Sequence, residues 1–261
     1  MVKKHFWWVL CVLVLVSVTA TSWRPAAASN TVNLKKENHS AKEVFEQYAN
    51  TIYQAANLQQ AGLDAGVFQK ALTGFFNLKL ANKLPQTSEI ITVVDFNKSS
   101  REKRMWIIDL FSKQLVLNTW VAHGQGSGDD MATRFSDRDE SHQSSLGFYV
   151  TDDVYQGKHG RSLRLDGMDA GFNASARARA VVVHAADYVS QGTINTLGRL
   201  GRSFGCPAVA PEVRDQVIDA IKGHTMLFIN GNDSSYASKY LDESNLQNFV
   251  PDTTEGQTAS R

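Results

Sequence analysis

A helical period in the hydrophobic residues marks the stretch 41–85. Apolar side chains there recur every three or four positions, as on one face of an amphipathic helix. A first group ends at Gly62, a second begins near Asp64, and Pro85 closes the stretch because proline cannot continue a helix. The sequence therefore predicts a helical hairpin that packs onto the rest of the protein. Its apolar faces comprise Val44, Phe45, Tyr48, Ile52, Tyr53 and Ala56, and then Val67, Phe68, Ala71, Leu72 and Phe75.

From residue 89 onward, short runs of β-branched, aromatic and other apolar residues replace the helical period. Such runs, bounded by turn residues, predict strands. The first three follow one another without an intervening helix, which favours antiparallel pairing. A short helix is expected over residues 211–222, because Pro211 suits the first helical turn. The sequence thus predicts a mainly β domain with α elements (α+β), preceded by the helical hairpin. The predicted strands cover residues 90–96, 105–110, 115–121, 146–150, 161–165, 181–184 and 225–230.

Two polar segments stand apart from this pattern. Residues 123–145 are rich in glycine, serine and charge. Loops of this length inside a domain are usually functional or disordered, so a lid over a cleft and a plain insert both remain open. Residues 232–261 are also polar, and we expect them to form a peripheral C-terminal tail.

The N-terminus has the features of a secretory signal. A positive start at residues 3–5 precedes an almost entirely apolar run over 6–18, and small residues follow as far as residue 20. The apolar run is short for a transmembrane helix, although an uncleaved anchor is the alternative. Cleavage after Ala28 is a second option for removal of the signal. We therefore expect a signal at 1–20, a flexible leader over 21–40, export to the periplasm or cell envelope, and no stable membrane insertion after cleavage.

Removal of the signal would leave a single cysteine in the mature chain. The chain has two cysteines, and Cys11 lies within the apolar run. Cys206 is then left alone and has no internal disulfide partner. A free thiol in an oxidising compartment is a liability unless it is buried or used. The formal net charge of +1 argues against nucleic acid as a partner, and we expect a monomer.

Cys206 and His184 are candidates for a nucleophile and its base. Cys206 follows a glycine-rich turn, and His184 ends the predicted strand 181–184. A histidine can accept the thiol proton and so activate the sulfur for attack on a carbonyl carbon. Backbone N–H groups around Gly205 are suited to stabilise the resulting oxyanion. That the two side chains lie close together is inferred from the sequence alone. The alternative to a catalytic role is a buried structural cysteine.

Two other kinds of site fit the sequence less well. Residues 201–205 match G-x-S-x-G, the nucleophile elbow of α/β hydrolases, with Ser203 as nucleophile. That elbow needs a strand directly before it and a helix directly after it, whereas Gly198 precedes it and Pro207 follows it. Metal binding is disfavoured because the candidate ligands have no fixed spacing, so we expect no metal and no cofactor. Those candidates are His123, Asp129, Asp130, His142 and His159.

The arrangement of His184 followed by Ser203-Phe204-Gly205-Cys206 resembles the signature of YkuD-type L,D-transpeptidases. These enzymes remodel bacterial peptidoglycan, and their signature is a histidine, a spacer of this size, and Ser-His-Gly-Cys. Residues 145–148 and 171–184 resemble further motifs of the family, the latter those of murein L,D-transpeptidase catalytic-domain proteins. The resemblance implies a YkuD-like mixed β-sheet sandwich domain over residues 88–231. The helical stretch resembles the N-terminal extension of that subgroup.

The resemblance also implies a mechanism of two-step acyl transfer between peptidoglycan stem peptides. Cys206 would attack the carbonyl of a diamino-acid residue in a tetrapeptide stem, and His184 would take the thiol proton and pass it to the leaving D-alanine. An amine from a second stem would then resolve the thioester. The backbone carbonyl of Ala185 would orient the histidine, the backbone N–H of Gly205 would serve the oxyanion, and Ser203 would shape the site.

The chain departs from the family signature at two positions. Phe204 replaces the histidine before Gly-Cys, and Ala208 replaces a polar or basic residue. Arg202 suits carboxylate recognition and is a candidate for the missing positive charge, or it is an ordinary surface arginine. Arg202, Ser203 and Phe204 are therefore the candidate substrate-binding residues. If water replaced the acceptor amine, the same fold would act as a peptidoglycan carboxypeptidase or amidase, and a non-catalytic wall-binding protein is the third alternative.

Overall fold

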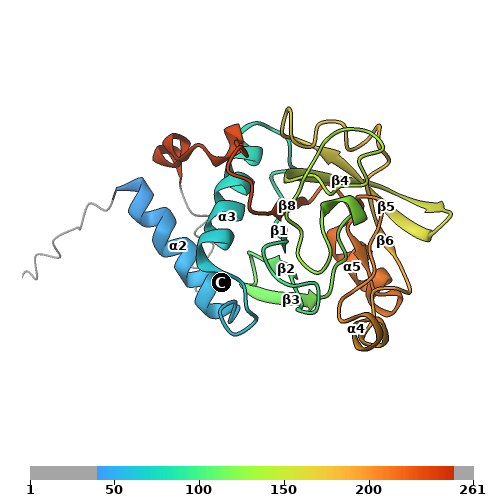
Figure 1. Ribbon diagram of the computed structural model, residues 1–261. Helices are drawn as coiled ribbons and strands as arrows, with labels where there is room; N and C mark the ends of the chain where they lie inside the picture. The colour runs from blue at the N-terminus through green and yellow to red at the C-terminus, as the bar shows by residue number, and fades with distance from the viewer. Residues whose placement is uncertain (1–39, 250–261) are drawn as a thin grey trace, which may run out of the picture. The chain divides into compact units, whose positions relative to one another are not determined.

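The computed structural model describes residues 40–249, which begin with two helices packed on a sheet (Figure 1). The helices are α2 (Ala41–Ala55) and α3 (Ala65–Leu80). The side chains of Ser40 and Asp64 cap them by accepting hydrogen bonds from backbone N–H groups of the first turn, which otherwise lack partners. The predicted helical hairpin is confirmed. The predicted signal and nearly all of the leader lie outside the described residues.

Eight strands form one mixed sheet in the order β3-β2-β1-β8-β4-β5-β6-β7. As predicted, β1, β2 and β3 pair in an antiparallel manner, but β1 also pairs with β8 in parallel, as β6 does with β7. The predicted α+β class is confirmed. The strands are β1 (Ile90–Asp95), β2 (Met105–Asp109), β3 (Gln114–Thr119), β4 (Gly147–Gly157), β5 (Gly160–Gly167), β6 (Val182–Ala185), β7 (Ala208–Val209) and β8 (Met226–Asn230).

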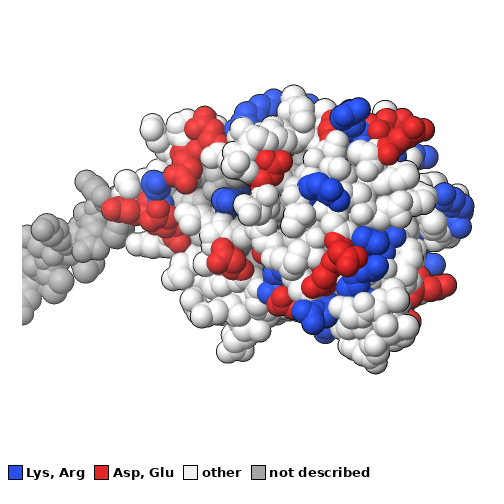
Figure 2. All heavy atoms as spheres, viewed as in Figure 1, with Lys and Arg blue, Asp and Glu red and all other residues white. Residues whose placement is uncertain are grey.

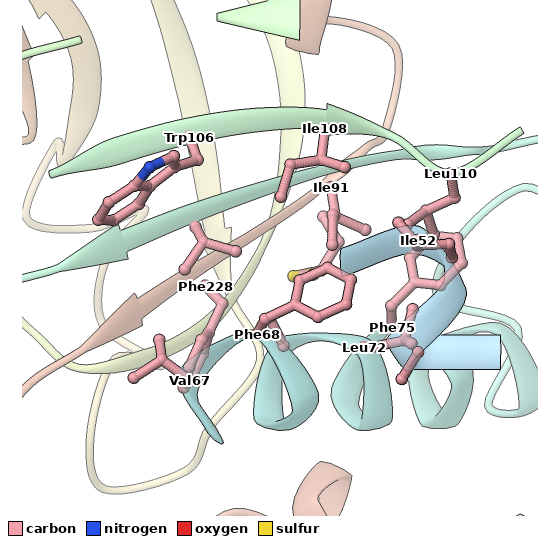
Figure 3. Close-up of a cluster of buried hydrophobic side chains, with 14 of the residues drawn as sticks. Ile52, Val67, Phe68, Leu72, Phe75, Ile91, Trp106, Ile108, Leu110 and Phe228 are labelled. Carbon is pink, nitrogen blue, oxygen red and sulfur yellow. The ribbon is translucent and has the colours of Figure 1, made fainter. Parts of the chain in front are cut away.

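The sheet buries hydrophobic side chains on both faces, because successive residues of a strand point to opposite sides. On β8, Phe228 belongs to the cluster under α2 and α3, whereas Leu227 belongs to the cluster on the opposite face. Figure 3 shows Phe68 and Phe228 within the first cluster. The second cluster is closed by α5 (Arg214–Ile221), which follows the short helix η2 (Pro211–Val213).

The segment after β8 differs from the peripheral tail that we expected. Tyr240 and Leu246 are 3% and 2% exposed and belong to the cluster under α2 and α3. The Asn77 side chain of α3 donates to the backbone carbonyl of Tyr240 at 2.8 Å. Two short helices, η3 (Lys239–Leu241) and η4 (Glu243–Asn248), carry these isolated apolar residues into the core. This part of the predicted tail therefore contributes to the core.

Two helices remain: the short helix η1 (Gln125–Ser127) follows β3, and α4 (Gln191–Leu197) lies between β6 and β7 and has no buried residue. None of the helices between residues 40 and 249 is long and apolar enough to cross a membrane. Acidic and basic side chains are interspersed on the face shown in Figure 2.

Candidate active site

Cys206 lies in the loop that joins α4 to β7, next to the start of β6. Its sulfur accepts a hydrogen bond from the backbone N–H of Val182 at 3.4 Å, and its S–H donates to the carbonyl of Ala180 at 3.6 Å. The thiol is free and only partly exposed. The first residues of β6 therefore hold the sulfur in place while one side of it stays accessible.

His184 lies on β6 and is only 3% exposed. Its Cα pairs in register with Ala208, two residues after the cysteine. The imidazole Nδ1 is 2.8 Å from the backbone carbonyl of Ala185. A carbonyl can only accept a hydrogen bond, so Nδ1 carries the proton and Nε2 keeps its lone pair. The structure thus places the Ala185 carbonyl where it fixes the tautomer that a general base needs.

The cysteine and the histidine are brought to neighbouring positions along one strand. The sulfur contacts the first residue of β6, Val182, and His184 is the third residue of the same strand. No hydrogen bond between described residues joins the thiol to the imidazole; the thiol is bonded to Val182 and Ala180. In this structure the thiol and the imidazole are therefore each hydrogen-bonded to the backbone and not to each other.

The surroundings favour the uncharged forms of both groups. Burial raises the pKa of the Cys206 thiol, although the Val182 N–H and the Arg179 guanidinium oppose this by stabilising the thiolate. Burial lowers the pKa of His184, with the Ala185 carbonyl acting in the opposite direction. Both groups are therefore uncharged at neutral pH, as a thiol and a neutral imidazole.

The turn before the cysteine is held by internal hydrogen bonds. The Ser203 hydroxyl donates to the carbonyl of Cys206 at 2.6 Å and accepts from the N–H of Gly205 at 3.0 Å. The Gly205 N–H, which we expected at the oxyanion, is thus directed to Ser203. Within residues 40–249, the N–H of Cys206 is hydrogen-bonded to no other residue; it faces the cysteine's own sulfur, where it favours the thiolate. Gly205 has φ +124°, and a Cβ there would lie 2.8 Å from the carbonyl of Gln143, so only glycine fits.

The two other candidate binding residues have different surroundings. Arg202 donates to the carbonyl of Gly128 at 2.7 Å and pairs with Asp129 at 3.2 Å, so its guanidinium is already bound by this chain. Phe204 is 65% exposed, and its ring stacks on that of His142 with centroids 4.4 Å apart. Phe204 therefore presents an aromatic surface close to the thiol.

The long polar segment 123–145 is packed against the site. The N–H of Gly126 donates to the carbonyl of His142 at 2.8 Å, which holds the two ends of the segment together. The Ser144 hydroxyl contacts the carbonyl of Gly205 at 3.3 Å. Arg179 donates to the carbonyls of Ser136 and Gln143, each at 2.9 Å. These contacts make the segment a wall beside the cysteine loop, which argues against a plain insert.

A buried arginine–histidine pair lies at the start of the segment 123–145. Arg104 is fully buried, and its guanidinium donates to Nδ1 of His123 at 2.8 Å. Since arginine can only donate, His123 is neutral and carries its proton on Nε2. The carbonyl of His123 accepts from the N–H of Ser203 at 3.0 Å. The pair therefore supports the backbone of the cysteine loop from beneath.

Several of these residues were missed as functional candidates. Arg179 lies in an alternation of arginine and alanine that resembles an exposed connection, and only the fold shows its side chain to be buried. His159 was considered only as a metal ligand, but its ring stacks on that of His184. Within the described part of the chain, no three histidine, cysteine, aspartate or glutamate side chains are placed to hold a metal ion.

Comparison with known proteins identifies the family. Residues 59–230 match the L,D-transpeptidase catalytic domain. The chain belongs to this family. The match begins before α3, so it includes the second helix as well as the sheet. No curated protein matches the chain in sequence.

Solved structures of L,D-transpeptidases are similar at low sequence identity. An L,D-transpeptidase from Mycobacterium smegmatis is 11% identical with a TM-score of 0.36, over 55% of this chain and 59% of that one. L,D-transpeptidase 1 from Mycobacterium tuberculosis is 12% identical with a TM-score of 0.31, over 55% of this chain and 62% of that one. Residues 123–326 of an L,D-transpeptidase from Xylanimonas cellulosilytica are 14% identical with a TM-score of 0.32, over 67% of this chain and 92% of that one. This chain covers less than two thirds of the first two.

Proposed function

We propose that this L,D-transpeptidase-family protein joins peptidoglycan stem peptides by acyl transfer through a thioester on Cys206. The observation that carries the proposal is a free thiol held at the start of β6, the strand that carries His184. The Nδ1 of His184 is bound to the Ala185 carbonyl, so that Nε2 remains a proton acceptor. Such stem peptides are found outside the cytoplasm. We therefore also propose that the N-terminal signal exports the protein to the periplasm or cell envelope.

Each step uses a group that the site provides. The thiol proton passes to Nε2 of His184 while the sulfur bonds to the carbonyl carbon of the donor stem. The N–H of Cys206 is suited to donate to the oxyanion once the sulfur has bonded to the carbonyl carbon. The carbon–nitrogen bond then breaks, and the leaving D-alanine takes the proton from His184. An amine of a second stem attacks the thioester and gives a proton to Nε2 of His184; the carbon–sulfur bond then breaks, and the sulfur takes that proton and leaves as the thiol.

Around these atoms, Ser203 and Phe204 have separate tasks. The Ser203 hydroxyl fixes the turn that presents the sulfur, because it bonds both the carbonyl of Cys206 and the N–H of Gly205. Phe204 offers an exposed ring to the bound stem. Arg202 is bound to Asp129 in this structure, so it contacts a substrate carboxylate only if that pair separates.

Hydrolysis of the same thioester is the second candidate function. Phe204 stands where the family signature has a histidine, so the acceptor side of the site lacks that polar group. A site that admits water in place of an amine would act as a carboxypeptidase or amidase. The two functions share the acyl-enzyme and differ only in how it is resolved.

Product analysis separates these functions. Purified tetrapeptide muropeptides are incubated with the wild type, with Cys206→Ala and with the surface control Phe111→Ala, and products and protein are analysed by mass spectrometry. We expect crosslinked dimers and a thioester adduct from the wild type and from Phe111→Ala, and neither from Cys206→Ala. Shortened stems without dimers would show hydrolysis instead. Full activity of Cys206→Ala, or no product from the wild type, would refute acyl transfer at this thiol.

A further inference from the structure

The turn between β4 and β5 reaches the histidine of the site. Its two residues, Lys158 and His159, connect the paired ends Gly157 and Gly160. The imidazole of His159 stacks on that of His184, with ring centroids 4.4 Å apart and an angle of 22° between the rings. His159 belongs to the turn and His184 to β6, and the two residues are 25 positions apart in the sequence.

The pairing of β5 with β6 explains this contact. Leu163 of β5 lies opposite Val183 of β6 in an antiparallel register. His184 follows Val183, so it lies beside the residues of β5 that come directly after the turn. The turn therefore ends over His184, and a side chain at position 159 is placed to cover its ring.

The exposure of the two rings shows what the contact does. His159 is exposed, whereas His184 is only 3% exposed. His159 therefore lies between solvent and the face of the His184 ring. The second restraint on His184 is the hydrogen bond from Nδ1 to the carbonyl of Ala185, which holds one ring atom at 2.8 Å. One hydrogen bond allows the ring to swing about it, and a stacked ring removes that freedom.

We propose that His159 is a positioning residue that holds the imidazole of His184 in place by stacking and shields it from water. The proposal rests on the proposed function, in which His184 is the base. His159 exchanges no proton with the substrate. Its contribution is to keep Nε2 directed toward the site while the Ala185 carbonyl keeps Nδ1 protonated.

Three variants separate stacking from charge. His159→Ala removes the ring, His159→Phe keeps a ring that cannot titrate, and Lys158→Gln removes the neighbouring charge but keeps His159. All three changes are in an exposed turn, so the fold is expected to persist. The titratable groups that surround His184 are His159 and Lys158 from this turn and the Cys206 thiol from the cysteine loop.

The first readout is the state of the His184 ring, measured by long-range ¹H–¹⁵N NMR during a pH titration. In His159→Ala we expect the pKa of His184 to rise toward its ordinary value, because both the burial and the positive charge that lower it are reduced. In His159→Phe the pKa should stay low, because burial is the larger cause and is retained. An unchanged titration and tautomer in His159→Ala would overturn the proposal.

The second readout is the rate at which Cys206 is acylated by a tetrapeptide stem. A stacked aromatic pair corresponds to a factor of about three to ten, so His159→Ala should be slower by about that factor. His159→Phe and Lys158→Gln should stay within about twofold of the wild type on the same reasoning. If the acylation rate of His159→Phe falls as much as that of His159→Ala, the loss of stacking does not explain the slower acylation. The NMR readout requires no turnover, so failure of the proposed function would leave it intact.

Discussion

The buried His123 predicts a specific loss of stability in acid. It is fully buried against Arg104, and burial followed by the charge of that guanidinium lowers the pKa of His123 to about 4. The unfolded chain has the ordinary value of 6.5. Because the folded-state pKa is the lower one, the unfolded chain binds more protons between these values. The contribution of His123 is therefore present above pH 6.5 and is lost as pH falls toward 4.

The size of this effect follows from the two pKa values. Each unit of difference corresponds to about 1.4 kcal/mol, so the full interval amounts to roughly 3 kcal/mol. About 2 kcal/mol of it should already be lost at pH 5, since the unfolded chain is then almost fully protonated at this site and the folded one is not. This is a large part of the stability of an ordinary domain, which is about 5 to 15 kcal/mol.

The assay compares urea unfolding at pH 7, 5 and 4 for the wild type and for His123→Asn. The asparagine Oδ1 occupies the place of Nδ1 and can accept from Arg104, but it does not titrate. We expect the variant to be less stable at pH 7, because a smaller side chain leaves a cavity. Between pH 7 and pH 4, the free energy of unfolding of the variant should then fall by roughly 3 kcal/mol less than that of the wild type.

His224→Asn is the matched control for this experiment, because it removes an exposed histidine. The control leaves the buried pair of His123 and Arg104 intact, so its stability should still fall in acid as that of the wild type does. If His123→Asn loses as much stability in acid as the wild type, His123 is not the source of the acid sensitivity and the reasoning is refuted.

Three further predictions concern packing and the thiol. Gly74→Ala should destabilise by about 1 to 3 kcal/mol, because the added methyl group overlaps the Phe148 ring. Gly192→Ala in α4 should be neutral or stabilising, because its methyl group would lie 3.8 Å from the Ser190 hydroxyl, an ordinary van der Waals contact; equal denaturation midpoints of the two variants would contradict this. Tyr240→Ala should cost about 3 to 5 kcal/mol, whereas the 73% exposed Phe111 should tolerate alanine within about 0.5 kcal/mol. Iodoacetamide should alkylate Cys206 slowly at pH 7, with a rate that still rises above pH 9, because burial raises the pKa of the thiol; a plateau below pH 8 would show otherwise.

The sequence predicted the elements whose hydrophobic pattern is strong. The strands β1, β2 and β8 read as apolar runs because they are buried on both faces, and the hairpin helices have wide apolar faces. The helix α4 was missed because none of its residues is buried, so it has no apolar period. The strand β7 has only two residues, Ala208 and Val209, too few to form a pattern. Tyr240 and Leu246 were missed because each is an isolated apolar residue in a polar segment.

The site could be predicted in its residue types but not in its contacts. Cys206 and His184 were chosen for their chemistry and for their resemblance to a family signature. The contact of His159 with His184 depends on the register between β5 and β6, and no local pattern encodes that register. The burial of Arg179 likewise depends on where the segment 123–145 folds back. Long-range pairing therefore decides which polar residues become part of the site.

The central position of β8 also affects how this protein can fold. This strand is the last of the sheet in sequence, yet it pairs with both β1 and β4 and so joins β1–β3 to β4–β7. The strands β1 and β4 each lack one neighbouring strand until β8, which ends at residue 230, has been synthesised. Contacts between such distant segments make folding slow, because a long loop must close first. The growing chain should thus leave the two parts of the sheet unjoined until β8 has been synthesised.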